Sequence, residues 1–326
     1  MTFLHQPPRR CLGVDVAKDT IAISDGCTAT VIANQRQQIR RFLRKCGAEL
    51  VICEPTGGYE TILMEECLVR KLPLHRADTR KLKAFIRSRG RLGKSDAIDA
   101  REMVAYGLER WATLPLWQAQ DPCEARLKAL VRRRADLVAI RVAEHNRAKA
   151  PSSHEPGSRE LGARELGARE LAASFKAMLD VLNRQILLVD KAIRALLRSA
   201  SLVQRTTTAT AMKGIGETTA AALIAAMPEL GKMDRRQAAA LAGLAPHPNE
   251  SGNKIGYRRM RGGRPSIRTI LFMPAMQAAQ GRGEFVAFYK RLIDNGKKPI
   301  VALAAVMRKI VITLNARFRD QLSQQS

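Results

Sequence analysis

Aromatic side chains are scarce in this chain, at 4% of 326 residues. Stacking of bases on aromatic rings is therefore excluded as the main way of holding a nucleic acid. Acidic residues are also few, because 30 Asp and Glu stand against 56 Lys and Arg, for a net charge of +26. An excess of that size favours a polyanionic partner, and contacts from Lys and Arg to phosphates should supply most of the binding.

Signals for zinc and for a membrane are missing as well. The six cysteines show no zinc-ligand spacing, and the five histidines form neither an HxH nor an HExxH pattern. We expect the cysteines to be small buried residues in a reducing compartment, which places the chain in the cytoplasm at the nucleoid. No run of 18 apolar residues occurs, and residues 1–10 lack the apolar core of a signal peptide, so no membrane contact is expected.

Hydrophobic residues make up 46% of the chain, enough for two modest domains with real cores. Residues 11 to about 110 alternate between strand and helix patterns, which predicts an α/β domain with a mixed sheet flanked by helices. The predicted strands are Cys11–Val16, Thr20–Ser24, Thr28–Ala33, Leu50–Glu54 and Leu72–Arg76, and the predicted helices are Gln35–Cys46, Tyr59–Lys71, Thr79–Arg87 and Asp96–Leu108.

Four acidic residues occupy suggestive positions in this part. Asp15 lies within the apolar strand Cys11–Val16, and Glu54 ends the second apolar run. Asp96 and Asp99 are three residues apart, on one face of a predicted helix. A strand-end Asp that caps the next turn is the simpler interpretation of Asp15 alone. Sites in open α/β sheets lie near the carboxyl ends of strands, so the four acids together could hold a divalent metal.

A basic segment leads directly into the Asp96/Asp99 pair. We expect it to contact phosphates, although a solvated helix face is the alternative. Its cations are Arg76, Arg80, Lys81, Lys83, Arg87, Arg89, Arg91 and Lys94, opposed only by Asp78.

The middle of the chain predicts a helical connector. Residues 111–120 are typical of a linker, and 124–149 and 171–197 have helical patterns that favour an antiparallel helical pair or coiled coil. Between them lie a loop at 151–157 and a five-residue repeat at 159–173. A period of five fits neither helix nor strand, which indicates a duplication in a tolerant connector.

The C-terminal part begins with Ala-rich helices near residue 205. A turn containing Gly214 and Gly216, followed by a short helix at 235–241, is typical of a helix-hairpin-helix. Its backbone N–H groups, with Lys213 beside them, would contact a DNA phosphate, although a plain tight turn is the alternative.

A glycine-rich stretch at 247–265 is predicted to be a loop. It contains Ser251, and serines in such loops are usually turn residues. Three helices should close the chain at 266–280, 284–295 and 300–319, the last of them in the core. The cations of the stretch and of the turn before the last helix are Lys254, Arg258, Arg259, Arg261, Arg264, Lys297 and Lys298.

These motifs, in this order, resemble DEDD-type insertion-sequence transposases with a catalytic serine, the bridge-RNA-guided DNA recombinases. The resemblance rests on Gly13–Lys18, Cys53–Gly57, Lys94–Arg101, Gly214–Gly216, Leu241–Pro246, Glu250–Gly252, Phe272–Met276 and Asn295–Lys298. It implies an RNase H-like (RuvC-like) DEDD domain at 1–115, linker and coiled-coil helices at 116–200, and an all-α, serine-bearing transposase domain at 201–326.

The resemblance also implies a chemistry. Asp15, Glu54, Asp96 and Asp99 would hold Mg²⁺, and Ser251 would attack a DNA phosphate to form a covalent phosphoserine. A structured noncoding guide RNA would pair with donor and target DNA, and the site would assemble between protomers of a dimer or tetramer. Two alternatives stay open: a junction-resolvase-like nuclease that uses activated water, and a nucleic-acid-binding protein without enzymatic activity.

Overall fold

The protein is described here from a computed structural model that covers residues 2–90, 96–150, 161–251, 254–256, 258–281 and 283–324. Only the backbone is described for residues 96–98, 161–168, 250, 251, 254 and 255. The chain forms two compact units, Met1–Ala119 and Gln120–Ser326. The expected connector helices at 116–200 belong almost entirely to the second unit.

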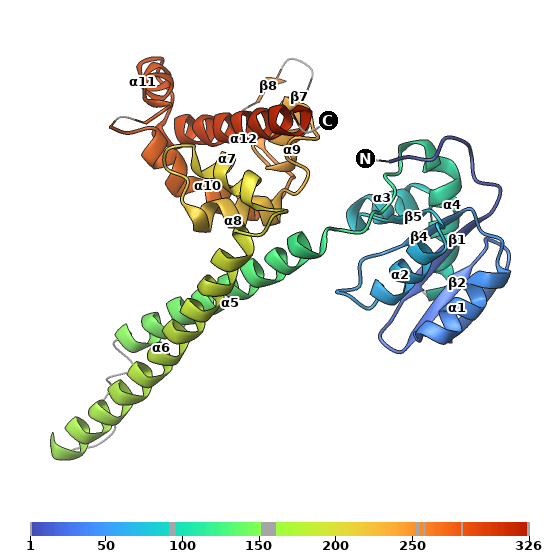
Figure 1. Ribbon diagram of the computed structural model, residues 1–326, viewed down its shortest axis with the longest axis horizontal. Helices are drawn as coiled ribbons and strands as arrows, with labels where there is room; N and C mark the ends of the chain where they lie inside the picture. Colours follow the sequence, from blue (N-terminus) through green and yellow to red (C-terminus); the bar gives the residue numbers. More distant parts are fainter. Residues whose placement is uncertain are drawn as a thin grey trace. The chain divides into compact units, whose positions relative to one another are not determined.

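The first unit is built on a five-stranded mixed sheet (Figure 1). Its strand order is β3-β2-β1-β4-β5. Strand β1 pairs antiparallel with β2, and β2 with β3, whereas β1, β4 and β5 run parallel. The strands are β1 (Cys11–Val16), β2 (Thr20–Ser24), β3 (Ala29–Ala33), β4 (Leu50–Cys53) and β5 (Leu74–Arg76).

Helices cover both faces of this sheet. The side chains of Leu12, Val14 and Val16 pack in one core with α1 (Arg36–Lys45) and α2 (Thr61–Val69). Cys11 faces the other core, with α3 (Thr79–Ser88) and α4 (Asp96–Arg110), and the short helix η1 (Trp111–Thr113) follows α4. This division follows from the alternation of side chains along a strand, and the prediction of a mixed α/β sheet flanked by helices is confirmed.

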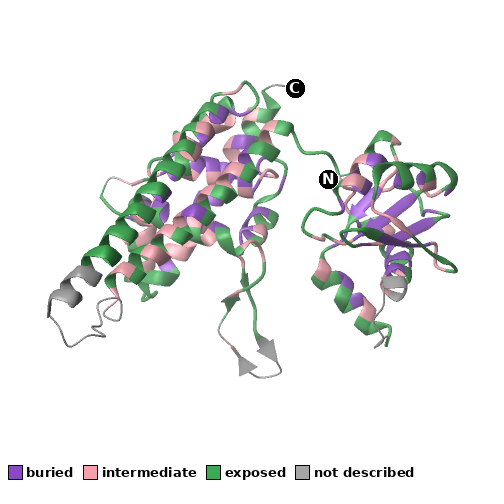
Figure 2. Cartoon of the chain, turned by 90° about the horizontal axis from the view of Figure 1, so that it is seen from below, coloured by how far each residue is buried: buried purple, intermediate pink, exposed green. Residues whose placement is uncertain are grey.

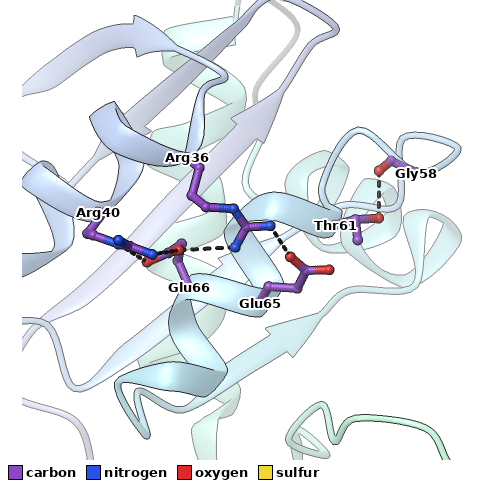
Figure 3. A network of polar contacts seen from close by, with 6 residues as sticks. All are labelled: Arg36, Arg40, Gly58, Thr61, Glu65 and Glu66. Atoms are coloured by element: carbon purple, nitrogen blue, oxygen red, sulfur yellow. Dashed lines mark hydrogen bonds and ion pairs between the residues drawn. The ribbon is translucent and has the colours of Figure 1, made fainter. Parts of the chain in front are cut away.

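An ion-pair network around the buried carboxylate of Glu66 connects α1 with α2 (Figure 3). The carboxylate of Glu66 on α2 is fully buried, and it accepts hydrogen bonds from Arg40 Nη2 at 3.0 Å and Arg36 Nη1 at 3.2 Å. Arg36 also pairs with Glu65. The Arg40 hydrogen bonds, ahead of the cost of burial, keep the pKa of Glu66 below its usual range. These contacts compensate a buried charge, which is the condition under which a buried glutamate is tolerated.

The second unit begins with two long antiparallel helices, α5 (Pro122–Lys149) and α6 (Leu161–Leu197). Arg134 on α5 pairs with Asp190 on α6, and Arg141 donates to Asn183, so the partners run in opposite directions. The predicted antiparallel pair is therefore confirmed.

The interpretation of the five-residue repeat as non-helical is wrong, because α6 already begins at Leu161. The side chains at residues 169–174 are exposed, so no packing partner imposes a 3.6-residue apolar period on this end of the helix. The Arg, Glu, Leu and Ala residues of the repeat are good helix formers, and this propensity accounts for its helical conformation.

The remaining helices pack against the start of α5 and the end of α6 around one core, which contains Leu127 of α5 and Ile193 of α6. They are α7 (Val203–Thr210), α8 (Glu217–Ala226), α9 (Arg235–Leu241), α10 (Pro265–Ala278), α11 (Val286–Asp294) and α12 (Pro299–Ser323). By length and composition, α12 is long and apolar enough to cross a membrane. Its Val306, Ile310 and Leu314 are buried in the core, as predicted for the last helix, and core helices pass the same test.

The stretch predicted as a loop at 247–265 forms short β-ladders. Strand β6 (Pro246–His247) pairs with β9 (Arg259–Met260), and β7 (Glu250–Ser251) pairs with β8 (Lys254–Ile255). Pro246, His247 and Arg259 in the first of these pairs are exposed. In Figure 2 buried residues gather in the strands of the five-stranded sheet and among the helices of the second unit. The loop prediction is wrong for these residues, because the turn-forming residues connect short paired strands. Strands of two residues are too short to show an alternating apolar pattern in the sequence.

The cysteine prediction is confirmed at four of the six positions, where Cys11, Cys46, Cys53 and Cys67 are buried thiols. Burial raises the pKa of Cys11, Cys53 and Cys67 to about 12, so these thiols stay protonated. Cys27 is exposed and does not fit the prediction.

Candidate active site

The register of the parallel strands places Asp15 beside Glu54. Val14 of β1 lies opposite Cys53 of β4, so the next residue on each strand is an acid. Leu50 and Ile52 face the core with α3 and α4, and by alternation Glu54 points to the same side as Asp15. Both acids are half-buried. The predicted proximity of Asp15 and Glu54 at the carboxyl ends of neighbouring strands thus agrees with the backbone pairing.

Helix α4 lies directly against this face of the sheet, and two glycines make the approach possible. A Cβ on Gly13 would lie 1.9 Å from the carbonyl oxygen of Ala100, and a Cβ on Gly107 would lie 2.5 Å from the sulfur of Cys11. The helix therefore runs opposite to β1. From Gly13 to Asp15 the strand advances by about 6.6 Å, a distance that a helix covers in four to five residues. Because α4 runs in the opposite direction, the residues opposite Asp15 lie four to five positions before Ala100. The first turn of α4, which contains Asp96 and Asp99, begins at this point.

The donor set at this end of the sheet fits a hard divalent cation. It consists of carboxylate oxygens, the ligands that Mg²⁺ prefers, and Mg²⁺ often takes only one or two carboxylates together with water and phosphate oxygens. Among the side chains that the structure describes, no three His, Cys, Asp or Glu residues form a metal-binding group. The side chain of Asp96 lies outside that set, whereas Asp99 is described and half-buried. Asp15 and Glu54 are thus the two neighbouring carboxylates on which a cation could rest.

Ser251 belongs to the second unit, whereas the four acids belong to the first. It is the last residue of β7, paired in the ladder with Lys254 of β8. The side chains of both residues lie outside the described set. The ladder places a serine and a lysine side by side in the backbone register, and exposed Arg258 and Arg259 follow a few residues later in the sequence.

Glu60 is a buried acid next to this site that the sequence analysis did not select. It is 2% exposed, and its Oε2 accepts from the Thr56 N–H at 3.1 Å, the Thr56 hydroxyl at 2.8 Å and the Gly58 N–H at 3.0 Å. Its Oε1 accepts from Arg76 Nη2 at 2.6 Å. Burial alone would raise the pKa of Glu60, but these hydrogen bonds from backbone and hydroxyl lower it to about 2.

The predicted phosphate contacts of the first unit fall on α3 and beyond. Arg80, Lys81, Lys83 and Arg87 are exposed on α3. Arg89 is exposed too, but it pairs with Glu102 at 3.0 Å and with Glu109. Arg91 and Lys94 lie outside the described residues.

The predicted contacts of the second unit are mostly exposed. The glycine turn joins α7 to α8, so these two helices flank the hairpin, and α9, which the sequence analysis took as the second helix, comes later. Gly214 has a φ of +94°, a left-handed conformation that favours glycine. Arg264 holds a bidentate ion pair with Glu229. Lys213, Gly216, Arg258, Arg259, Arg261, Lys297 and Lys298 are exposed, and the side chain of Lys254 is not described.

A second basic surface lies on α1 and was also missed. The helix has five Lys or Arg and no acid, and Arg36 and Arg40 are compensated by the glutamates of α2. We call the three that remain, all exposed, the α1 basic tail: Arg41, Arg44 and Lys45. Arg41 and Lys45 line a cavity of about 450 Å³, together with Arg10. A helix with charges of only one sign was a usable signal for this surface.

Comparisons with known proteins agree with this architecture. Residues 12–150 match the family model of the IS110-type DEDD transposases, and residues 206–290 match the model of the IS116/IS110/IS902 transposase family. The chain is 26% identical over 324 residues to a pilin gene-inverting protein of Moraxella bovis, with 95% of each chain covered. A protein of the same name from Moraxella lacunata is 26% identical over 327 residues, with 95% coverage of each.

The DEDD match implies an RNase H-like fold for the first unit and a dependence on divalent metal. The matches favour DNA transposition over the nuclease alternative and over a binding protein without activity. The chain therefore carries the transposase domains that both IS110-family models describe, over residues 12–150 and 206–290, and transposases of this kind act on DNA.

Proposed function

We propose that this transposase cuts and rejoins DNA through a covalent bond between Ser251 and a DNA phosphate. The observation that carries the proposal is the adjacency of Asp15 and Glu54 under the first turn of α4, in a chain that also matches the transposase domain containing Ser251. The two Moraxella relatives are named for inverting a gene, an operation that requires rejoining as well as cleavage. Rejoining favours a covalent intermediate over hydrolysis by water, because the energy of the phosphodiester is conserved.

The proposed step balances as follows. The Ser251 hydroxyl oxygen attacks the scissile phosphorus and loses its proton, while the bond from phosphorus to a deoxyribose oxygen breaks and that oxygen takes up a proton. The product is a phosphoserine and a free DNA hydroxyl. Attack by the hydroxyl of another strand on the phosphoserine then restores the serine and joins the new strands.

Asp15, Glu54, Asp96 and Asp99 would hold the divalent ion, for which we propose Mg²⁺. When bound, it would stabilise the charge that develops on the phosphate and lower the pKa of the attacking hydroxyl. Without a cation the four carboxylates repel one another, which disfavours their close approach. The cations on α3 and near β9 would hold the phosphates on either side of the scissile bond.

We also propose that a structured RNA selects the donor and target sequences, and that the active unit is a dimer or tetramer in the cytoplasm at the nucleoid. The net charge of +26 and the few aromatic residues support binding to nucleic-acid phosphates, which carry no sequence information. Base pairing between the RNA and the DNA would then select the sequence.

Trapping and mapping the covalent adduct tests the central proposal. The protein is incubated with nicked or suicide DNA substrates and Mg²⁺, the adduct is digested, and the modified peptide is identified by mass spectrometry. We expect the phosphodeoxynucleotide on Ser251 and no adduct with Ser251→Ala. Ser266→Ala is the matched control, since Ser266 is an exposed serine of the same unit, on α10. Strand cleavage by Ser251→Ala at the wild-type rate would refute the proposal.

A further inference from the structure

The loop that follows Glu54 is folded around the carboxylate of Glu60. Two backbone N–H groups and one hydroxyl of this loop, from Thr56 and Gly58, point inward to Glu60 Oε2. Gly57 and Gly58 have φ of 83° and 125°, a conformation that favours glycine and lets the loop close on itself. Thr56 is two residues from Glu54, and Pro55 between them has a fixed φ. The path of the chain out of β4 is therefore set by a buried charge.

The same carboxylate also holds the neighbouring strand. Glu60 Oε1 accepts from Arg76, which lies opposite Cys53 in the parallel register of β4 and β5. The Ala77 N–H donates to the Cys53 carbonyl at 2.8 Å. Glu60 thus ties the loop after Glu54 to the end of β5.

Asn34 connects this loop to the chain that leaves β1. Its Nδ2 donates to the Ala17 carbonyl at 2.9 Å and to the Tyr59 carbonyl at 3.1 Å. Ala17 is two residues beyond Asp15, and Tyr59 directly precedes Glu60. The hydrogen bonds of Asn34 and Glu60, joined by the peptide bond between Tyr59 and Glu60, therefore link the backbone beside Asp15 with the backbone beside Glu54. This link lies beyond Val14 and Cys53, the last pair in the register of β1 and β4.

We propose that Glu60 and Asn34 are positioning residues that hold Asp15 and Glu54 at the separation a divalent ion requires. We call the two residues the acid brace. Neither residue is assigned to contact the metal or the DNA. The inference rests on the metal site of the proposed function, and it adds that metal affinity depends on side chains outside the four acids. Its physical basis is the repulsion between two carboxylates, which pushes unbraced strand ends apart before a cation binds.

Metal binding by the full chain, without DNA, tests the inference. Mn²⁺ serves as the probe, and its dissociation constant is measured by the electron paramagnetic resonance of free Mn²⁺ or by calorimetry. The variants are Glu60→Gln and Asn34→Ala, with Thr56→Val as a milder third that removes only the hydroxyl bond to Glu60. The matched control is Glu66→Gln, which removes a buried, ion-paired carboxylate of the same unit. Thermal unfolding of each variant is recorded without metal.

We expect Glu60→Gln and Asn34→Ala each to weaken Mn²⁺ binding fivefold or more, Thr56→Val about twofold, and Glu66→Gln less than twofold, even where Glu66→Gln lowers the melting temperature as much. Unchanged affinity in Glu60→Gln and Asn34→Ala would overturn the inference. So would a loss in Glu60→Gln alone, because Glu60 would then be a ligand rather than part of a brace. Equal losses in all variants and the control would also overturn it, as general destabilisation.

Asp15→Asn separates this inference from the proposed function. Mn²⁺ binding by the wild type but not by Asp15→Asn would support the metal site. In that case, wild-type affinity in Glu60→Gln and Asn34→Ala would overturn the acid brace alone. A wild-type chain that binds no Mn²⁺ would overturn the metal site and the brace together.

Discussion

The contact between Gly13 and α4 gives the most direct test of how the site is built. The perturbation is Gly13→Ala, which adds one methyl group. That Cβ would lie 1.9 Å from the Ala100 carbonyl oxygen and 2.8 Å from Met103 Cβ, whereas ordinary contacts begin at 3.4 Å. The helix must therefore move away from β1 by about 1.5 Å, because the nearest obstacle is backbone and no rotamer change removes it. The displaced segment is the one that carries Asp99.

Overpacking of a core usually costs about 1–3 kcal/mol, and a forced backbone shift belongs at the top of that range, about 3 kcal/mol. With a urea dependence of about 1.5 kcal/mol per molar, the unfolding midpoint of the first unit should fall by about 2 M. The two tryptophans of the chain, Trp111 and Trp117, both belong to the first unit, so tryptophan fluorescence follows this unit alone. The same variant should also bind Mn²⁺ more weakly than the wild type.

Gly107→Ala is the matched control on the same helix. Its Cβ would meet Cys11 Sγ at 2.5 Å and Ile52 Cγ1 at 2.9 Å, and side chains can rotate or be shortened. Adding Cys11→Ala should recover about 1 kcal/mol of the loss from Gly107→Ala, whereas no second side-chain truncation should rescue Gly13→Ala. A midpoint change below 0.5 M urea in Gly13→Ala would refute the claim that α4 lies hard against β1.

Two further predictions concern charge. The pKa of Glu60 is about 2 in the folded chain against 4.5 ordinarily, so its contribution to stability is present above about pH 4.5 and is lost as the pH falls toward 2. Between pH 5 and 2, the free energy of unfolding measured by tryptophan fluorescence should therefore fall less steeply for Glu60→Gln than for the wild type. Equal slopes would contradict the lowered pKa of Glu60. Substituting all three residues of the α1 basic tail with Gln should lower the slope of log K against log salt by about 2 to 3, uniformly across DNA and RNA sequences. An unchanged slope in filter binding would show that the tail contacts no phosphates.

The strands that carry the acids were predictable because their apolar residues alternate cleanly. The predicted bounds Cys11–Val16 and Thr20–Ser24 coincide with β1 and β2. A strand with one face in each of two cores leaves few acceptable registers, since a slip by one residue would bury Asp15 among the apolar side chains of the opposite face. The position of Glu54 beside Asp15 follows from the same constraint, and that much of the site could be read from the chain alone.

Other parts could not be predicted because no packing pattern marks them. The described side chains nearest the start of α6, at residues 169–174, are exposed, so no burial pattern marks this part of the helix and only helix propensity favours it. The five-residue repeat conceals that propensity. The ladders around Ser251 contain two residues per strand, too few for alternation to be visible. The roles of these segments depend on backbone hydrogen bonds, which the identity of the side chains specifies only weakly.

Three glutamates of the first unit, six residues apart in sequence, show why residue type alone does not assign an acid to a metal. Glu66 accepts three hydrogen bonds from two arginines, and Glu60 accepts four from the chain around it. A cation would have to displace these donors, at a cost of roughly 1–3 kcal/mol for each buried group left unpaired. Glu54, which directly follows β4, lies beside a second acid, Asp15, where a cation would gain two carboxylates at once. The donors around Glu60 and Glu66 therefore mark these two carboxylates as structural, and the adjacent acid is the feature that favours Glu54 as a metal ligand.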